Sequence, residues 1–294
     1  MAELFSSSAK LSEVSPAPIR DPAKAGRPAL SGRAAPLLLL SLILALLCSC
    51  AQGSGALWNR EVGRGLAMGF RPCDLPAPPF RLAGLIKGDK GEDLVVYIEG
   101  DGRAVIRGKP SADPTPRLAQ SWELARLDPS PLVLYLARIG QFMPAFSGAR
   151  FQYYWTTGRL APEVVAGASA AIDEIKRRVG AKRLHLVGFS GGGGLAVLLA
   201  GARTDVASLV TVAGLLDTDW WVKDNGWLPL TGSLNPAGAA GLLASIPQIH
   251  YYGLSDKVIV PAMSARFAAM APFASLKRVG LELDHYSGWT DNWP

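Results

Sequence analysis

The segment Gly188-Phe189-Ser190-Gly191-Gly192 restricts the fold of this chain more than any other feature. It lies between an apolar run at 184–187, which predicts a buried strand, and an apolar run at 191–202, which predicts a helix. A serine at the apex of such a turn has to adopt a strained backbone, and glycines two residues before and after it let the strand and helix approach without side-chain clashes. The pattern predicts a tight turn from strand to helix that presents a serine hydroxyl.

This turn also places the start of a helix beside the serine. The positive end of the helix and the N–H group of Gly191 can stabilise an oxyanion, so Ser190 is a candidate nucleophile for acyl transfer. Two other interpretations are a glycine-rich turn with an incidental serine and a phosphate-binding loop. A phosphate-binding loop needs Lys followed by Ser or Thr after its glycines, and Leu195 and Ala196 stand there instead.

Apolar runs typical of strands alternate with helical patterns along the rest of the chain. This alternation predicts one α/β domain with a doubly wound, mainly parallel sheet. The predicted strands are 94–98, 132–136, 184–187, 208–213, 248–252 and 276–283, and the predicted helices are 162–179, 191–202 and 261–272.

A serine nucleophile needs a base, and the chain contains three histidines. His185 and His250 lie inside predicted strands, where a packed imidazole is the ordinary outcome. His285 follows the last predicted strand, at the carboxyl edge of the sheet where a general base is needed. His285 is therefore the predicted base, and the competing interpretation is a solvated loop histidine.

The base needs an acid to orient it, and several aspartates follow predicted strands. Asp256 comes directly after the strand at 248–252, which favours it on position. Asp217 and Asp219, after the preceding strand, are the alternatives. Asp284 is adjacent to His285 and is expected to point away from it, because neighbouring residues on an extended segment face opposite sides.

The loop after the strand at 94–98 reads Glu99-Gly100-Asp101-Gly102-Arg103 and is the candidate source of a second oxyanion donor. Its glycines expose backbone N–H groups, and the donor is predicted to be the N–H of Asp101 or of Gly102. The alternative is a simple β-turn.

The turn at 188–192, called the nucleophile elbow, the acid Asp256 and the base His285, in this order along the chain, resemble the α/β-hydrolase superfamily. The resemblance implies attack of Ser190 on an acyl carbonyl, proton transfer through His285, orientation of that imidazole by Asp256, and release of the acid by water. It implies a serine hydrolase of esters or thioesters that acts on a small-molecule acyl substrate and needs no cofactor. The chain also has no metal-spaced cluster of His, Cys and Asp, so no metal is expected. Segments 153–157 and 230–236 are similar to a group of bacterial, predicted lipoprotein hydrolases without an assigned substrate.

A loop-rich insert between the predicted strands at 208–213 and 248–252 holds Trp220, Trp221 and Trp227. These tryptophans are candidates for a lid or pocket wall, and the alternative is that they cover the edge of the sheet. Trp289 and Trp293 are expected to pack the loop of His285.

The N-terminus predicts export. Residues 36–47 form an apolar run preceded by Arg27 and Arg33, and the run is too short to cross a bilayer. It continues into Cys48-Ser49-Cys50, which resembles a lipobox with Cys50 as the lipidated residue, so a lipid anchor in the bacterial cell envelope is expected. Alternatives are a plain signal peptide and an uncleaved anchor. The predicted organisation is a leader at 1–49, a tether and entry segment at 50–79 that starts with a flexible stretch at 52–55, and a hydrolase domain at 80–294.

Charge and cysteines restrict the remaining possibilities. The formal charge of +6 includes five basic and three acidic residues in the leader. The basic residues of the domain itself form no continuous stripe, so nucleic-acid binding is not expected. Cys73 is expected to be an inert thiol in a loop. Two alternative functions remain: acyl transfer to an acceptor other than water, and a non-catalytic envelope binding protein with a hydrolase fold.

Overall fold

The computed structural model describes residues 53–293 except 147, 272 and 274. The predicted leader and the lipidation candidate Cys50 lie outside the described residues. Within the described part, no helix combines the length and apolar character needed to cross a membrane.

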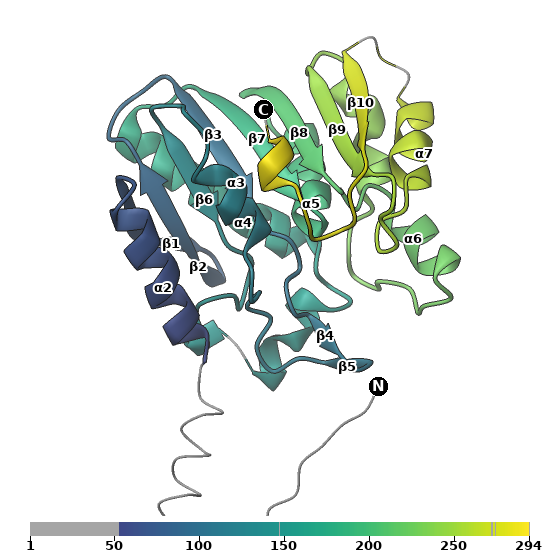
Figure 1. Ribbon diagram of the computed structural model, residues 1–294, viewed down its shortest axis with the longest axis horizontal. Coiled ribbons are helices and arrows are strands. Elements are labelled where there is room, and N and C mark those ends of the chain that lie inside the picture. The colour runs from purple at the N-terminus through teal and green to yellow at the C-terminus, as the bar shows by residue number, and fades with distance from the viewer. Residues whose placement is uncertain (1–52, 147, 272, 274, 294) are drawn as a thin grey trace, which may run out of the picture. The chain divides into compact units, whose positions relative to one another are not determined.

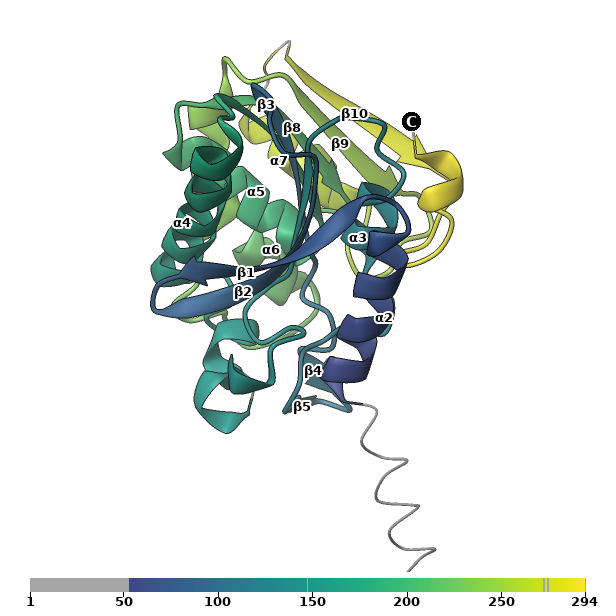
Figure 2. The ribbon, with the colours of Figure 1, turned by 90° about the vertical axis from the view of Figure 1, so that its left-hand side faces the viewer.

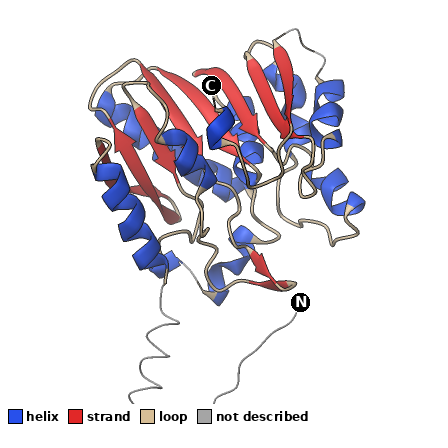
Figure 3. Ribbon diagram, viewed as in Figure 1, coloured by secondary structure: helices blue, strands red, loops and turns tan. Residues whose placement is uncertain are grey.

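The described strands form an eight-stranded sheet in the order β1-β2-β6-β3-β7-β8-β9-β10 (Figures 1 and 3). β2 pairs antiparallel with both β1 and β6, and the pairs from β6 to β10 are parallel. The strands are β1 Phe70–Ala77, β2 Phe80–Lys87, β3 Asp93–Ile98, β6 Val133–Leu136, β7 Arg183–Phe189, β8 Val206–Val212, β9 Gln248–Gly253 and β10 Leu276–Leu281, with a separate hairpin of β4 Val105–Ile106 and β5 Lys109–Pro110.

Helices cover both faces of this sheet (Figure 2). One face packs against α4 Pro162–Val179, α5 Gly191–Ala202, α6 Thr218–Asp224 and α7 Ala262–Met270, around a core of Leu, Ile, Val and Ala. The other packs against α2 Ser54–Leu66 and α3 Gln120–Ala125 around a core rich in aromatic rings. Short 3₁₀ segments occupy Pro144–Phe146, Ala149–Trp155, Pro236–Leu243 and Thr290–Asn292. This is the doubly wound α/β architecture that the alternating pattern predicts.

All six predicted strands and all three predicted helices are present, with ends that shift by up to two residues. The prediction for α4 is confirmed to the residue: Pro162 opens the helix, and Gly180 ends it with a φ of 74°, a left-handed conformation that glycine adopts without strain. The proline and glycine signals therefore mark both ends of this helix correctly.

The predicted domain start at residue 80 is too late. Ser54 and Gly55, predicted as part of a flexible tether, begin α2, and β1 pairs along its whole length with β2. The prolines of β1 and the Pro78-Pro79 turn hide the strand signal, because proline lacks the N–H that a sheet needs. They are tolerated here because β1 is an edge strand. Cys73 accordingly lies in a strand and not in a loop.

Candidate active site

Ser190 stands at the turn between β7 and α5, as predicted. Its φ of 52° and ψ of −121° form a conformation that L-residues rarely adopt. The flanking glycines are required by close backbone contacts: a Cβ on Gly188 would lie 2.3 Å from the carbonyl oxygen of Gly192, and one on Gly192 would lie 2.3 Å from that of Ile98. The fold therefore presses the strand and helix together and forces the serine outwards.

His285 lies in the loop after β10 and meets the serine. Its Nε2 is 3.1 Å from Ser190 Oγ, within hydrogen-bond reach. The imidazole is 4% exposed and contacts the ring of Phe189 on one side and the edge-on ring of Tyr286 on another. Trp289 donates from Nε1 to the carbonyl oxygen of His285, so the expectation that this tryptophan packs the loop is confirmed.

Asp256 completes the chain of contacts. Its Oδ2 is 2.7 Å from His285 Nδ1, and its Oδ1 accepts hydrogen bonds from the N–H groups of Val258 and Ile259, each at 2.8 Å. The carboxylate is buried, and three donors fix its orientation. Asp284 instead accepts hydrogen bonds from the N–H groups of Tyr286 and Ser287, each at 2.7 Å, and is not the partner of the imidazole, as expected.

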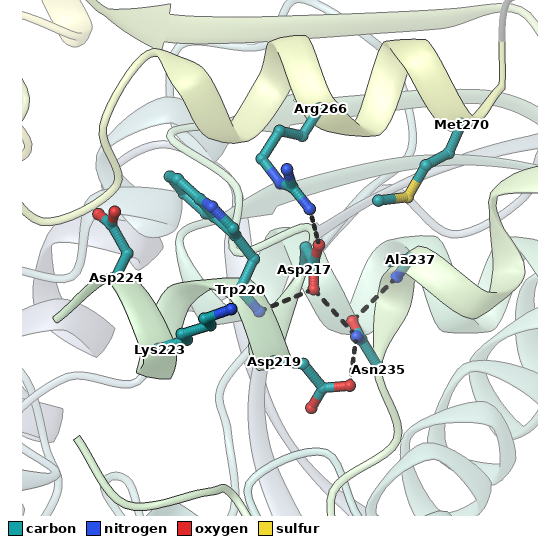
Figure 4. Close-up of a pocket in the computed structure, with 9 residues that line it drawn as sticks. All are labelled: Asp217, Asp219, Trp220, Lys223, Asp224, Asn235, Ala237, Arg266 and Met270. Carbon is teal, nitrogen blue, oxygen red and sulfur yellow. Dashed lines mark hydrogen bonds and ion pairs between the residues drawn. The ribbon is translucent and has the colours of Figure 1, made fainter. Parts of the chain in front are cut away.

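The alternative acid Asp217 does not take part in the contacts that link Ser190, His285 and Asp256. It caps α6 by accepting from the N–H of Trp220, accepts from Asn235 Nδ2 at 3.0 Å, and lies 3.6 Å from Arg266. These residues and Asp219 line a hollow between α6 and α7 with a volume of about 790 Å³. Figure 4 shows how their side chains lie around it. As the partner of His285, Asp217 is a wrong alternative, because helix capping occupies it.

The three tryptophans of the insert have separate positions. Trp220 lines the hollow of Figure 4 and stacks with Arg266. Trp221 is buried, donates from Nε1 to the carbonyl oxygen of Val258 at 2.9 Å, and lies under the guanidinium of Arg159. Trp227 is 52% exposed and packs edge-on against Trp221. Of the three, Trp221 is linked directly to the segment that holds Asp256.

The loop after β3 lies against the elbow. A Cβ on Gly100 would be 3.3 Å from Ser190 Cβ, and one on Gly191 would be 2.1 Å from Asp101 Oδ1. Gly102, with a φ of 60°, faces away, towards Pro114 and Gln141. Of the two residues predicted to supply a donor from this loop, Asp101 is the one whose side chain contacts the elbow.

Glu99 anchors the start of this loop from inside the protein. Its side chain is 2% exposed, and its Oε1 accepts from the N–H of Gly100 at 2.9 Å and more weakly from that of Ser121. Tyr135 donates its hydroxyl to Oε2 at 3.2 Å. Burial raises the pKa of Glu99 to about 7, although the hydrogen bonds act in the opposite direction.

Three side chains at this site carry no motif and were not predicted: Arg138, Gln141 and Arg159. Arg138 and Arg159 both pair with the carboxylate of Asp101, and Gln141 donates to the carbonyl oxygen of Gly100. Arg138 and Gln141 follow β6 at the carboxyl edge of the sheet, the same position rule that pointed to Asp256 and His285. Their position directly after a predicted strand could therefore have marked Arg138 and Gln141 as candidate site residues.

The other histidines and the thiol have structural surroundings. Burial lowers the pKa of His250 to about 4, and its Nδ1 is 2.7 Å from Thr211 Oγ1 in the neighbouring strand. His185 bridges Ser208 and Asp93 across three strands. Burial raises the pKa of Cys73 to about 12, which agrees with an inert thiol. Among the residues that the structure describes, no group of three or more ligands is arranged to hold a metal.

Comparisons with known proteins identify the fold. No family model and no curated protein match the sequence. An acylaminoacyl peptidase from Pyrococcus horikoshii is similar in structure at 14% identity and a TM-score of 0.56, over 74% of this chain and 37% of the peptidase. Est1E from Butyrivibrio proteoclasticus is similar at 11% identity and a TM-score of 0.54, over 75% of this chain and 93% of Est1E. A Pyrococcus furiosus esterase is similar at 15% identity and a TM-score of 0.54, over 76% of this chain and 84% of the esterase.

These likenesses and the sheet order show that the chain has the α/β-hydrolase fold. The chain spans little more than a third of the peptidase, whereas it spans most of the two esterases. At these identities the likeness concerns the fold, and the chemistry has to be argued from the site itself.

Proposed function

We propose that this protein is a serine hydrolase that cleaves a carboxylic ester or thioester through an acyl-enzyme on Ser190. The proposal rests on two linked contacts of the His285 imidazole. Its Nε2 is 3.1 Å from Ser190 Oγ, and its Nδ1 is 2.7 Å from Asp256 Oδ2. A non-catalytic protein that merely kept the fold has no reason to retain this chain of contacts.

In the proposed mechanism, His285 in its neutral form donates from Nδ1 to Asp256 and accepts the Ser190 proton at Nε2. Ser190 Oγ attacks the acyl carbonyl, and Asp256 stabilises the imidazolium that forms. The N–H groups of Gly191 and Asp101 bind the oxyanion. Gly191 opens α5, where no preceding helical carbonyl takes its N–H. His285 returns the proton to the leaving group, and it then activates the water that releases the acid.

One likeness supports an ester-type substrate: the Pyrococcus furiosus protein, of which this chain covers 84%, is named an esterase. The alternative function is transfer of the acyl group to an alcohol or amine. Product analysis with an added acceptor distinguishes this transfer from hydrolysis.

Covalent labelling with a fluorophosphonate probe tests the proposal. The wild-type protein is expected to be labelled at Ser190, and Ser190→Ala is expected to lose all labelling. Ser208→Ala is a matched control, because Ser208 also contacts a histidine that contacts an aspartate, at 2.8 Å and 3.1 Å, but lies within a strand and not at the start of a helix. The proposal fails if the wild type is unlabelled or if Ser190→Ala is labelled equally.

We further propose that the protein is exported in bacteria and anchored to the cell envelope by a lipid on Cys50. The support is the apolar run at 36–47 followed by the lipobox-like Cys48-Ser49-Cys50. Metabolic labelling with an alkyne fatty acid is expected to mark the wild type and Cys48→Ser but not Cys50→Ser. Labelling that survives in Cys50→Ser would reject Cys50 as the anchor.

A further inference from the structure

We propose that Asp101, Arg138 and Arg159 form a buried charge cluster that positions the oxyanion loop, residues 99–103, for reaction at Ser190. The proposal rests on the proposed hydrolase function. It assigns a role to two arginines that the mechanism above does not use and that belong to no recognised motif.

The cluster joins three segments that are far apart in sequence. Asp101 follows β3, Arg138 follows β6, and Arg159 precedes α4. Asp101 Oδ1 lies 3.3 Å from Arg138 Nη1, and its Oδ2 lies 2.6 Å from Arg159 Nη1. The side chains are 16%, 6% and 9% exposed for Asp101, Arg138 and Arg159, so most of this charge is withdrawn from water. Burying three charges is costly unless each is paired, and this geometry pairs them.

Each arginine is itself held by backbone carbonyl groups. Arg138 donates to the carbonyl oxygen of Arg159, and Arg159 donates from Nε to that of Thr156 at 2.7 Å. The ring of Trp221 lies under the Arg159 guanidinium. The two guanidinium groups are therefore fixed before any substrate arrives, and they fix the carboxylate between them.

The carboxylate in turn contacts the elbow. A Cβ on Gly191 would lie only 2.1 Å from Asp101 Oδ1, so the carboxylate rests against the first residue of α5. Gln141 reinforces the arrangement, since its Nε2 donates to the carbonyl oxygen of Gly100 at 2.8 Å while its Oε1 accepts from the N–H of Arg138 at 3.0 Å. The loop is thus attached to the elbow and to the end of β6 at the same time.

The sign of the charge also matters at this position. Burial acts to raise the pKa of Asp101, but the charges of Arg159 and Arg138 outweigh it and hold the pKa below its ordinary value, so the carboxylate is ionised. An isolated carboxylate beside the oxyanion site would oppose the negative charge of the transition state. The two arginines offset this repulsion, so the carboxylate can hold the loop in place without opposing the oxyanion.

Steady-state hydrolysis of p-nitrophenyl acetate by the full chain tests the cluster. Asp101→Asn keeps the shape of the side chain but removes the charge that holds both arginines. Its kcat is expected to fall about 10- to 100-fold with KM within about threefold, because the loss concerns groups that act in the transition state. Arg159→Gln is expected to behave alike, and Arg159→Lys, which restores a cation, is expected to recover part of kcat.

A tetrahedral inhibitor separates positioning from a general loss of structure. The affinity of a trifluoromethyl ketone, whose adduct with Ser190 carries an oxyanion, is expected to fall in these variants by the same factor as kcat/KM. Arg203→Gln is the matched control: Arg203 is equally buried between Asp173 and Asp205, but it lies at the opposite end of α5. This variant is expected to be less stable and to keep the wild-type kcat and inhibitor affinity.

The outcomes distinguish the two proposals. A wild type that neither turns over the ester nor is labelled at Ser190 overturns the hydrolase function, and the cluster's role with it. A labelled, active wild type whose Asp101→Asn and Arg159→Gln variants keep kcat within about threefold overturns the cluster's role alone. The cluster's role is also overturned if Arg203→Gln loses kcat to the same extent as these variants. It is likewise overturned if these variants lose kcat but bind the inhibitor as tightly as the wild type does.

Discussion

Replacement of His285 by alanine is expected to lower kcat/KM for an activated ester by a factor of about 10⁴ to 10⁶. The imidazole touches Ser190 Oγ at 3.1 Å and is the group within reach that can take its proton. Without it the hydroxyl is a weak nucleophile, and only substrate binding and the oxyanion donors remain. Steady-state kinetics on the purified variant, with circular dichroism to verify folding, measures the effect.

The partner of the histidine gives a matched pair of variants. Asp256→Asn is expected to lower kcat about 10⁴-fold, because an asparagine no longer holds the imidazole with its proton on Nδ1. Asp217→Asn, the acid that the sequence leaves as an alternative, caps α6 and is expected to keep kcat within about threefold. The reverse pattern, with activity lost in Asp217→Asn and kept in Asp256→Asn, would contradict the assignment.

These assignments show which part of the site is predictable from sequence. The elbow is a local sequence pattern: Gly188 is required by contact with Gly192 of the same turn, and Gly192 by contact with the end of the neighbouring strand β3. His285 follows by elimination among three histidines, and Asp256 follows from its place after a strand. Each of these inferences needs only the position of a residue relative to one predicted element, and such positions are what hydrophobic periodicity supplies.

The contacts of the cluster were not predictable in the same way. Asp101 is separated by 37 residues from Arg138 and by 58 from Arg159, and no spacing rule joins them. The sequence suggested Asp101 for its backbone N–H, whereas its side chain proves to be the centre of a charge cluster. Pairing between loops is decided by strand order, and the insertion of β6 between β2 and β3 is not visible in a single sequence.

The first elements of the fold were missed for a different reason. β1 is an edge strand interrupted by Pro72 and Pro76, and proline normally argues against a strand. α2 begins within a Gly-Ser stretch that is typical of a linker, but its Glu61 is buried and accepts from the indole of Trp122 at 2.9 Å. In both cases tertiary packing outweighs local propensity.

Glu99 makes the stability of the protein depend on pH. Burial raises its pKa from 4.5 to about 7 in the folded protein, so between these values the folded state holds a proton that the unfolded state has released. The proton bound to Glu99 therefore contributes its full amount to the free energy of unfolding below pH 4.5. This contribution is lost as the pH rises through about 7. A shift of this size corresponds to about 3 kcal/mol of unfolding free energy.

Glu99→Gln removes the titration while keeping an acceptor for the N–H of Gly100. The free energy of unfolding of the variant, relative to wild type, is therefore expected to rise by about 3 kcal/mol between pH 4 and pH 8, measured by urea denaturation at a series of pH values. Glu123→Gln is a control of opposite sign. Burial acts to raise the pKa of Glu123, but hydrogen bonds from Arg64 and Arg126 outweigh it and lower that pKa, so its stabilisation is lost only as the pH falls below the ordinary range of a glutamate. A difference between Glu99→Gln and wild type that stays constant from pH 4 to pH 8 would show that the buried carboxyl of Glu99 does not titrate in this window.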